Sequence, residues 1–176
     1  MSKNPRAAGQ SSSRTPKPPK PVRPRDVPPP SGPPPAVVFL VPLIAAAGLD
    51  KLVPWPIPGD HYVRLIGAAL ILIALPIMFW ASGTQTKHRT TTKAWHEADA
   101  LVTDGPFAFS RNPAYVGDVI WYLGGTLAIQ SWWAAVLLPV VLVAFHFLVV
   151  KPEEDYLAAR FGSAWTEYAS RVRRWI

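Results

Sequence analysis

The stretch PAYVGDVIWYLGGTLAIQ (113–130) runs directly into SWWAAVLLPVVLVAFHFLVV (131–150). Each holds about 18–20 residues, which as an α-helix extends roughly 27–30 Å and matches the hydrocarbon core of a bilayer. Buried helices of a soluble protein are seldom this long and this free of charge. Because only the Gln130–Ser131 junction separates them, the two stretches predict a membrane hairpin whose outer ends return to the same face.

Two more apolar stretches precede the hairpin. The first contains Pro42 and reaches Asp50–Lys51 near its end, whereas the second is apolar apart from Arg64, whose long side chain can extend to the membrane surface. The sequence therefore predicts an all-α integral membrane protein with one membrane domain at 36–176. Its transmembrane helices, about four, are expected at 36–53, 62–81, 113–130 and 131–150.

Residues 1–35 differ from the rest of the chain in composition. They are rich in Pro, Ser, Lys and Arg and hold almost nothing that could form a core. Such a segment cannot bury enough apolar surface to offset its ordering entropy, so we expect a disordered tail with polyproline character. The tail is expected to touch anionic lipid headgroups, and a docking segment for a protein partner is the alternative.

The basic residues indicate an orientation. The net charge is +7, and there is no cysteine, which excludes disulfides and thiolate metal sites. If residue 1 is cytosolic, sixteen of the 18 Lys and Arg fall on the cytosolic side, and only Lys51 and Arg64 fall on the other. This distribution predicts that both termini are cytosolic. It also accounts for the basic charge without nucleic acid as a partner.

The region after the hairpin, EEDYLAARFGSAWTEYASRVRRWI (153–176), is amphipathic. Its apolar residues recur at spacings of three and four, which predicts a single apolar stripe on one or two helices. Gly162 interrupts the pattern. We expect these helices to lie on the membrane surface or to fold back against the spans. The stripe consists of Leu157, Phe161, Trp165, Tyr168 and Val172.

The stretch GPFAFSRNPAYVGD (105–118) lies where the chain re-enters the membrane. Asn112 followed by Pro113 is a typical helix start, with Asn as N-cap and Pro at the first helical position. Arg111 is not needed for that start. A guanidinium beside free backbone N–H groups favours an anionic group held at the membrane surface. The alternative is a basic anchor flanked by aromatic residues.

Glu153 and Glu154 directly follow the fourth expected span. They either open the C-terminal helix, where carboxylates suit the helix dipole, or face Arg111 and bind a ligand. Because the hairpin returns both motifs to one face, we expect a site there. Asp118 and His146 are ionisable groups inside spans and are candidates by default. The His residues at 88 and 96 show no metal-ligand spacing, so no metal site is predicted.

The motifs LVTDGPFAFSRNPAYVG (101–117) and EEDYLAARFGSAWTEYASRV (153–172), separated by the hairpin, resemble the isoprenylcysteine carboxyl methyltransferase family, which is related to the phospholipid N-methyltransferases. The resemblance covers roughly residues 62–176. It implies that S-adenosylmethionine (SAM) binds at the cytosolic face and that a lipophilic methyl acceptor enters from the membrane. Arg111 and Glu154 are the catalytic candidates. The positions that correspond to cofactor contacts are Leu101, Val102, Phe107, Asn112, Pro113, Ala114, Tyr115 and Glu153.

The sequence departs from the family pattern at three places. Asn112 stands where many members have His, and Phe107 stands where many have Tyr. In the prenylcysteine enzymes an Arg shortly before the acidic pair contacts the substrate, whereas here residues 148–150 are Leu-Val-Val, followed by Lys151. Both a carboxylate and an amine therefore stay open as the acceptor. An amine would need a base, for which Glu154, His146 and Asp118 are all candidates.

The leading hypothesis is thus an integral membrane SAM-dependent methyltransferase. A membrane reductase of related architecture is the second, although the sequence adds no nicotinamide signature. The third is a non-enzymatic membrane protein whose Pro-rich tail recruits a partner.

Overall fold

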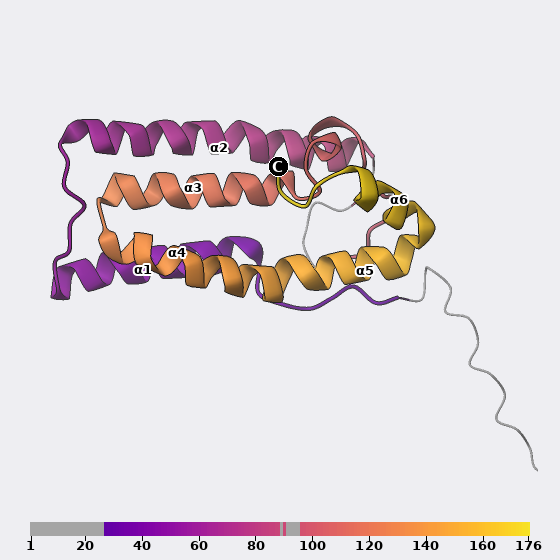
Figure 1. Ribbon diagram of the computed structural model, residues 1–176, viewed down its shortest axis with the longest axis horizontal. Helices are drawn as coiled ribbons and strands as arrows, with labels where there is room; N and C mark the ends of the chain where they lie inside the picture. The colour runs from indigo at the N-terminus through magenta and orange to yellow at the C-terminus, as the bar shows by residue number, and fades with distance from the viewer. Residues whose placement is uncertain (1–26, 89, 91–95) are drawn as a thin grey trace, which may run out of the picture.

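The computed structural model describes residues 27–88, 90 and 96–176, and in these ranges the elements are helical, as the sequence predicts (Figure 1). The predicted disorder of the tail falls mostly on residues 1–26, which lie outside the described ranges. Residues 27–34 form no helix and lead into α1. The elements are α1 (Pro35–Leu52), α2 (His61–Lys87), the 3₁₀ turn η2 (Gly105–Ala108), α3 (Pro113–Ile129), α4 (Trp132–Phe145), the π-helical turn η3 (His146–Val150), α5 (Lys151–Phe161) and α6 (Ser163–Arg171).

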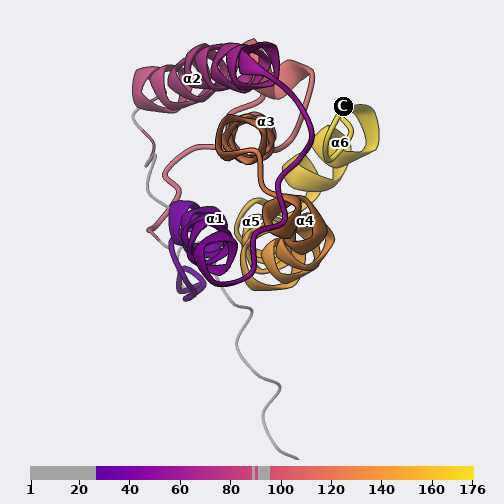
Figure 2. The same cartoon turned by 90° about the vertical axis from the view of Figure 1, so that its left-hand side faces the viewer.

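Three helices of the described chain are long and apolar enough to cross a membrane: α1, α2 and the continuous helix Trp132–Phe161 of 30 residues. The helix that begins at Trp132 continues without a break through η3 and α5, past residue 150, where the sequence predicts that the last span ends; the point at which it leaves the bilayer is still a prediction. The expected span at 113–130 is α3, which has 17 residues and would extend roughly 26 Å. It lies among the longer helices (Figure 2), and its crossing of the bilayer stays a prediction.

Glycines allow α3 to pack closely against α2. A Cβ atom on Gly67 of α2 would lie 2.6 Å from the carbonyl oxygen of Gly124 in α3, and one on Gly124 would lie 2.7 Å from the carbonyl oxygen of Gly67. Small residues at such positions let two helix backbones approach closely, which is a common device in membranes. The close approach fixes where the first residues of α3 stand at the end of the bundle.

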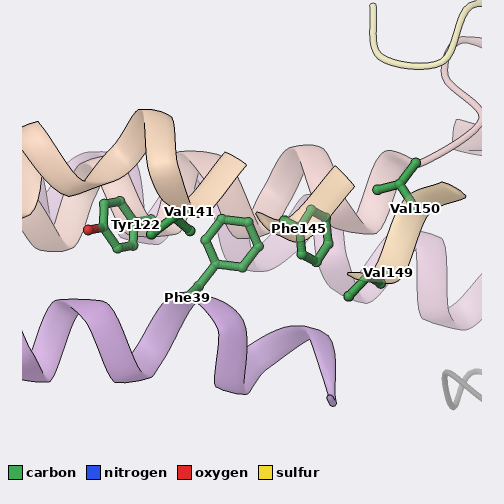
Figure 3. Close-up of a cluster of buried hydrophobic side chains, with 6 residues drawn as sticks. All are labelled: Phe39, Tyr122, Val141, Phe145, Val149 and Val150. Carbon is green, nitrogen blue, oxygen red and sulfur yellow. The ribbon is translucent and has the colours of Figure 1, made fainter. Parts of the chain in front are cut away.

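On its other side α3 contributes to a buried apolar cluster with α1 and α4 (Figure 3). Phe39 of α1 packs on Phe145 of α4 with ring centroids 4.7 Å apart. The Tyr122 hydroxyl of α3 donates a hydrogen bond of 2.9 Å to the carbonyl of Ala134 in α4. The cluster therefore ties three helices together just below the end of the bundle where Phe145 leads into η3.

The hairpin between α3 and α4 turns at Gln130, whose φ of 51° is left-handed. Its side chain is held on both sides: Arg64 donates from Nε to its Oε1 at 2.7 Å, and its Nε2 donates to the Gly59 carbonyl at 2.9 Å. These bonds offset the cost of an unusual conformation for a residue with a Cβ atom. The turn of α3 into α4 is thus joined to the start of α2.

The amphipathic C-terminal region folds back on the protein. The chain breaks at Gly162, with φ 55° and ψ −123°, between α5 and α6. Trp165 and Tyr168, two residues of the predicted stripe, are buried. Figure 1 shows α6 returning from the far end of α5 toward the start of α3. The stripe therefore packs partly against protein, which is one of the two arrangements that the sequence left open.

Candidate active site

The start of α3, the segment before η2 and the helices α5 and α6 enclose a cavity of about 120 Å³. The structure brings all ten candidate residues to its wall. These are Leu101, Val102, Phe107, Arg111, Asn112, Pro113, Ala114, Tyr115, Glu153 and Glu154. Sequence reasoning missed four further wall residues on α5 and α6, namely Tyr156, Leu157, Trp165 and Tyr168. Leu157, Trp165 and Tyr168 belong to the amphipathic stripe, which does not by itself distinguish a protein-facing from a lipid-facing side chain, whereas Tyr156 carried no signal in the sequence.

One part of the wall is a pair formed by Tyr115 and Glu153. The Tyr115 hydroxyl donates a hydrogen bond of 2.6 Å to Oε2 of Glu153. The Tyr115 ring meets Phe145 edge-to-face, with centroids 5.0 Å apart and an interplanar angle of 89°. Because Phe145 belongs to the buried cluster, the core orients Tyr115, and Tyr115 in turn orients the carboxylate.

The π-helical turn η3 sets the direction in which the acidic pair points. The backbone N–H of Lys151 donates to the carbonyl of His146, five residues earlier. A turn of this kind holds one residue more than an α-helical turn, so everything after it is rotated by about 100° relative to an unbroken α-helix. The extra residue therefore contributes to the directions in which Glu153 and Glu154 point.

Glu154 accepts hydrogen bonds from Arg174, a residue that sequence reasoning counted only as a basic charge. Arg174 donates from Nε to both carboxylate oxygens at 3.1 Å and from Nη2 to Oε2 at 2.7 Å. Arg111 approaches from the other side, with Nη2 3.4 Å from Oε1. The Glu154 side chain is only 12% exposed. Both alternatives for the acidic pair therefore hold in part: Glu153 and Glu154 lie in the first turn of α5, and Glu154 faces Arg111, with Arg174 as a second arginine.

Arg174 belongs to residues 172–176, here named the C-terminal strap, which follow α6 and lie against the start of α3. The backbone N–H of Arg111 donates to the carbonyl of Arg173 at 2.9 Å. The Asn112 amide and the Ser110 hydroxyl both donate to the carbonyl of Arg174, at 3.1 and 3.2 Å. Asn112 occupies the N-cap position, but its side chain does not cap the helix. The predicted helix start at Asn112–Pro113 is confirmed, but the expected side-chain cap is absent, because the hydrogen bond from Asn112 Nδ2 to the strap turns the side chain away from the N–H groups of α3.

Arg111 itself is enclosed. Its guanidinium lies over the Trp165 ring, 5.7 Å from the centroid, and its buried Nε finds no hydrogen-bond partner among the described residues. Next to it, the Tyr168 hydroxyl donates a 2.7 Å hydrogen bond to the carbonyl of Phe107. Burial raises the pKa of Tyr168 to about 12, and the nearby Arg111 charge opposes that shift. Helix α6 therefore holds both η2 and Arg111 in place.

The two ionisable candidates within the helices lie apart from this group. Asp118 is on α3, one turn beyond Tyr115, and is not among the residues that line the cavity. His146, at the start of η3, lines a separate apolar cleft of about 550 Å³ between α3 and α4. In the described part of the chain, no three His, Asp or Glu side chains lie close enough together to hold a metal ion.

Known proteins share most of the sequence that forms this cavity. Residues 63–164, more than half of the chain, match the family described as phospholipid methyltransferase. The chain belongs to the phospholipid methyltransferase family. The matched region contains all ten candidate residues of the cavity. The strap, with Arg174, lies beyond it.

Among curated proteins similar to this chain, the protein-S-isoprenylcysteine O-methyltransferase of Schizosaccharomyces pombe is 38% identical over 72 residues, which are 41% of this chain and 30% of that protein. Protein-S-isoprenylcysteine O-methyltransferase B of Arabidopsis thaliana is 36% identical over 76 residues, 43% of this chain and 39% of its own length. A probable protein-S-isoprenylcysteine O-methyltransferase of Oryza sativa subsp. indica is 28% identical over 113 residues, 63% and 59% of the two chains. The matches thus span between about a third and three fifths of these relatives. No solved structure matches the chain significantly.

Proposed function

We propose that this protein transfers a methyl group from SAM to a lipophilic acceptor at the membrane surface. The observation that carries the proposal is that the wall of one cavity, at the end of the helix bundle, holds all ten residues singled out from the sequence. Membership of the methyltransferase family and the names of the relatives support it. We infer from the distribution of Lys and Arg that this end of the bundle is cytosolic.

The wall of the cavity fits SAM chemically. Glu153, held by Tyr115 at 2.6 Å, supplies a fixed carboxylate for a cationic group or for ribose hydroxyls. Leu101, Val102 and Phe107 supply apolar surface for a flat adenine ring. SAM, when bound, contributes a methyl group on a positively charged sulfur.

Catalysis in such a site comes mainly from positioning the two reactants, and an acceptor atom that has no proton to lose needs no added acid or base. Three contacts hold the wall rigid: the Tyr115–Glu153 hydrogen bond, the Tyr168 hydrogen bond to the Phe107 carbonyl, and the arginine pairs of Glu154. Because the carboxylate of Glu154 is already paired, it serves to orient Arg111 and Arg174 and not as a free base.

The proposal is tested by calorimetric titration of SAM into the full chain purified in detergent. Glu153→Ala is expected to weaken SAM binding by about 10- to 100-fold, the usual effect of losing a hydrogen bond to a buried charged group. Asp155→Ala is the matched control. Asp155 lies two residues on in the same helix, its side chain is 66% exposed, and among the described residues its ion pair is with Lys151.

Wild type and Asp155→Ala are expected to bind SAM equally. If a folded wild-type protein bound no SAM, the proposed function would be wrong. Equal SAM affinity in Glu153→Ala and wild type would show that Glu153 does not bind the cofactor, and the cavity would then lack the carboxylate that the proposal assigns to SAM.

A further inference from the structure

The C-terminal strap reaches two cavities at once. Arg174 holds Glu154 on the wall of the polar cavity. The next two residues, Trp175 and Ile176, line the apolar cleft between α3 and α4. The remaining wall of that cleft is apolar except for His146, and it consists of Val116, Val119, Ile120, Leu142, Val143 and Phe147. A guanidinium therefore stands at the boundary between a polar cavity and a cleft suited to an aliphatic chain.

The charges around this boundary do not balance. Arg111 and Arg174 share one carboxylate, that of Glu154, so the three groups carry a surplus of one positive charge. Glu153 is turned away toward Tyr115. SAM carries two positive groups and one carboxylate, so its net positive charge is matched by Glu153. With SAM bound, the surplus positive charge on the two arginines remains, and an anion in the same place would neutralise it.

Arg174 is held in a fixed position, unlike a typical surface arginine, and can therefore present its guanidinium to an anionic group. Its side chain is fixed by three hydrogen bonds to Glu154, and its backbone carbonyl is fixed by Asn112 and Ser110. A guanidinium has five N–H donors, and Arg174 uses Nε and Nη2 on Glu154. With 39% of its side chain exposed, it retains donors for a ligand.

We propose that Arg174 determines the acceptor specificity of this protein. Together with Arg111, it favours an acceptor that carries a carboxylate next to an apolar chain over one that carries an amine. This inference rests on the proposed function. It assigns the recognition of the acceptor to a residue that lies outside the region matching the methyltransferase family. Arg174 also supplies a cation beside Glu154 in a chain whose residues 148–150 are Leu, Val and Val and provide none.

The chemistry is consistent with a carboxylate. One of its oxygens forms a bond to the methyl carbon while the bond from that carbon to sulfur breaks, and the electron pair stays on sulfur. The products are a neutral ester and a neutral thioether, and no proton moves. An ammonium acceptor would first have to release a proton beside two arginines, and Glu154 is already engaged by both. The same cluster that attracts a carboxylate therefore repels an ammonium.

The test compares two acceptors that share one apolar chain. N-acetyl-S-farnesylcysteine carries the carboxylate, and S-farnesylcysteamine carries an amine instead. Transfer of labelled methyl groups from SAM is measured with the full chain in lipid nanodiscs, for wild type, Arg174→Gln and Arg174→Lys. Arg173→Gln is the matched control, because its exposed side chain lies next in the sequence while its carbonyl makes the contact to α3.

Wild type is expected to prefer the carboxylate. Arg174→Gln should raise the KM for the carboxylate by about 10- to 100-fold, the usual effect of losing a charge-assisted hydrogen bond, and should weaken SAM binding by a smaller factor, because Arg174 also holds Glu154 on the cavity wall. Arg174→Lys keeps the charge but loses the forked geometry, so its KM should rise less, by about 3- to 10-fold. Arg173→Gln should behave as wild type.

Several results would overturn the assignment. A wild-type preference for the amine would do so while leaving SAM-dependent methylation intact. A loss of the same size for both acceptors in Arg174→Gln would reduce Arg174 to a positioning residue for Glu154. If Arg174→Gln does not fold, an unchanged preference and KM in Arg174→Lys would also refute the proposal. Failure of the wild type to bind SAM would instead refute the proposed function itself.

Discussion

The contact between α2 and α3 gives a quantitative prediction, because the α3 start that carries the site depends on it. A methyl group added at Gly124 would lie 2.7 Å from the carbonyl oxygen of Gly67 and 2.8 Å from Cγ1 of Ile71. Ordinary contacts of this kind are about 3.5 Å, so the two helices must separate by about 0.7–0.8 Å. Overpacking of this size typically costs about 1–3 kcal/mol.

A glycine-to-alanine change in a helix also brings a gain of about 1 kcal/mol from backbone propensity, which a control must remove. Gly83 of α2 provides that control, since a Cβ atom there meets no atom within 4 Å. Gly124→Ala is therefore expected to be about 1–3 kcal/mol less stable than Gly83→Ala. The measurement is the free energy of unfolding of both variants by denaturant titration in the same detergent.

Equal stability of the two variants would refute the reasoning, because it would mean that α2 and α3 are not in backbone contact in the folded protein. A Gly83→Ala protein that is itself less stable than wild type would show that exposed glycines in these helices have a role other than packing.

Two further predictions concern the groups that surround the site. Tyr168→Phe removes the donor to the Phe107 carbonyl and should lower the free energy of unfolding by about 1–2 kcal/mol, measured by denaturant titration. A change below the error of that measurement would mean that water replaces the hydroxyl. His88, 2.7 Å away, lowers the pKa of Asp104 from its ordinary 3.8, chiefly through a hydrogen bond. The resulting stabilisation is present above pH 3.8 and is lost as the pH falls through the lowered pKa. The free energy of unfolding of Asp104→Asn should therefore fall less steeply below about pH 4 than that of the wild type. An identical pH profile in the two proteins would show that the His88–Asp104 pair does not cause the fall.

Some features of the site could be predicted because they depend on local sequence. Gly105–Pro106 and Asn112–Pro113 mark a turn and a helix start by their backbone preferences alone. Glu153 and Glu154 follow an apolar run of membrane length, and a hairpin necessarily returns them to the face where that run's partner began. The sequence therefore placed Arg111, Tyr115 and the acidic pair near one another without any knowledge of their contacts.

Other features could not be predicted because they depend on rotation and on distant contacts. The π turn at 146–150 changes which way Glu153 points, yet it leaves no mark in an apolar sequence. Asn112 was expected to cap α3 with its side-chain oxygen, but its side chain is oriented by the hydrogen bond from Nδ2 to the Arg174 carbonyl, 62 residues away. The residues Trp165 and Tyr168 could face lipid or protein equally well, since both environments are apolar.

The sequence by itself determined the helical membrane architecture, the hairpin and the neighbourhood of the two site motifs, because apolar length and backbone preference act over a few residues. Only the tertiary structure decided which charges meet. Arg174 reaches Glu154 because the chain reverses at Gly162 and α6 packs on η2. An ion pair between residues on separate elements depends on the angle between those elements, and that angle is set by the packing of the whole bundle.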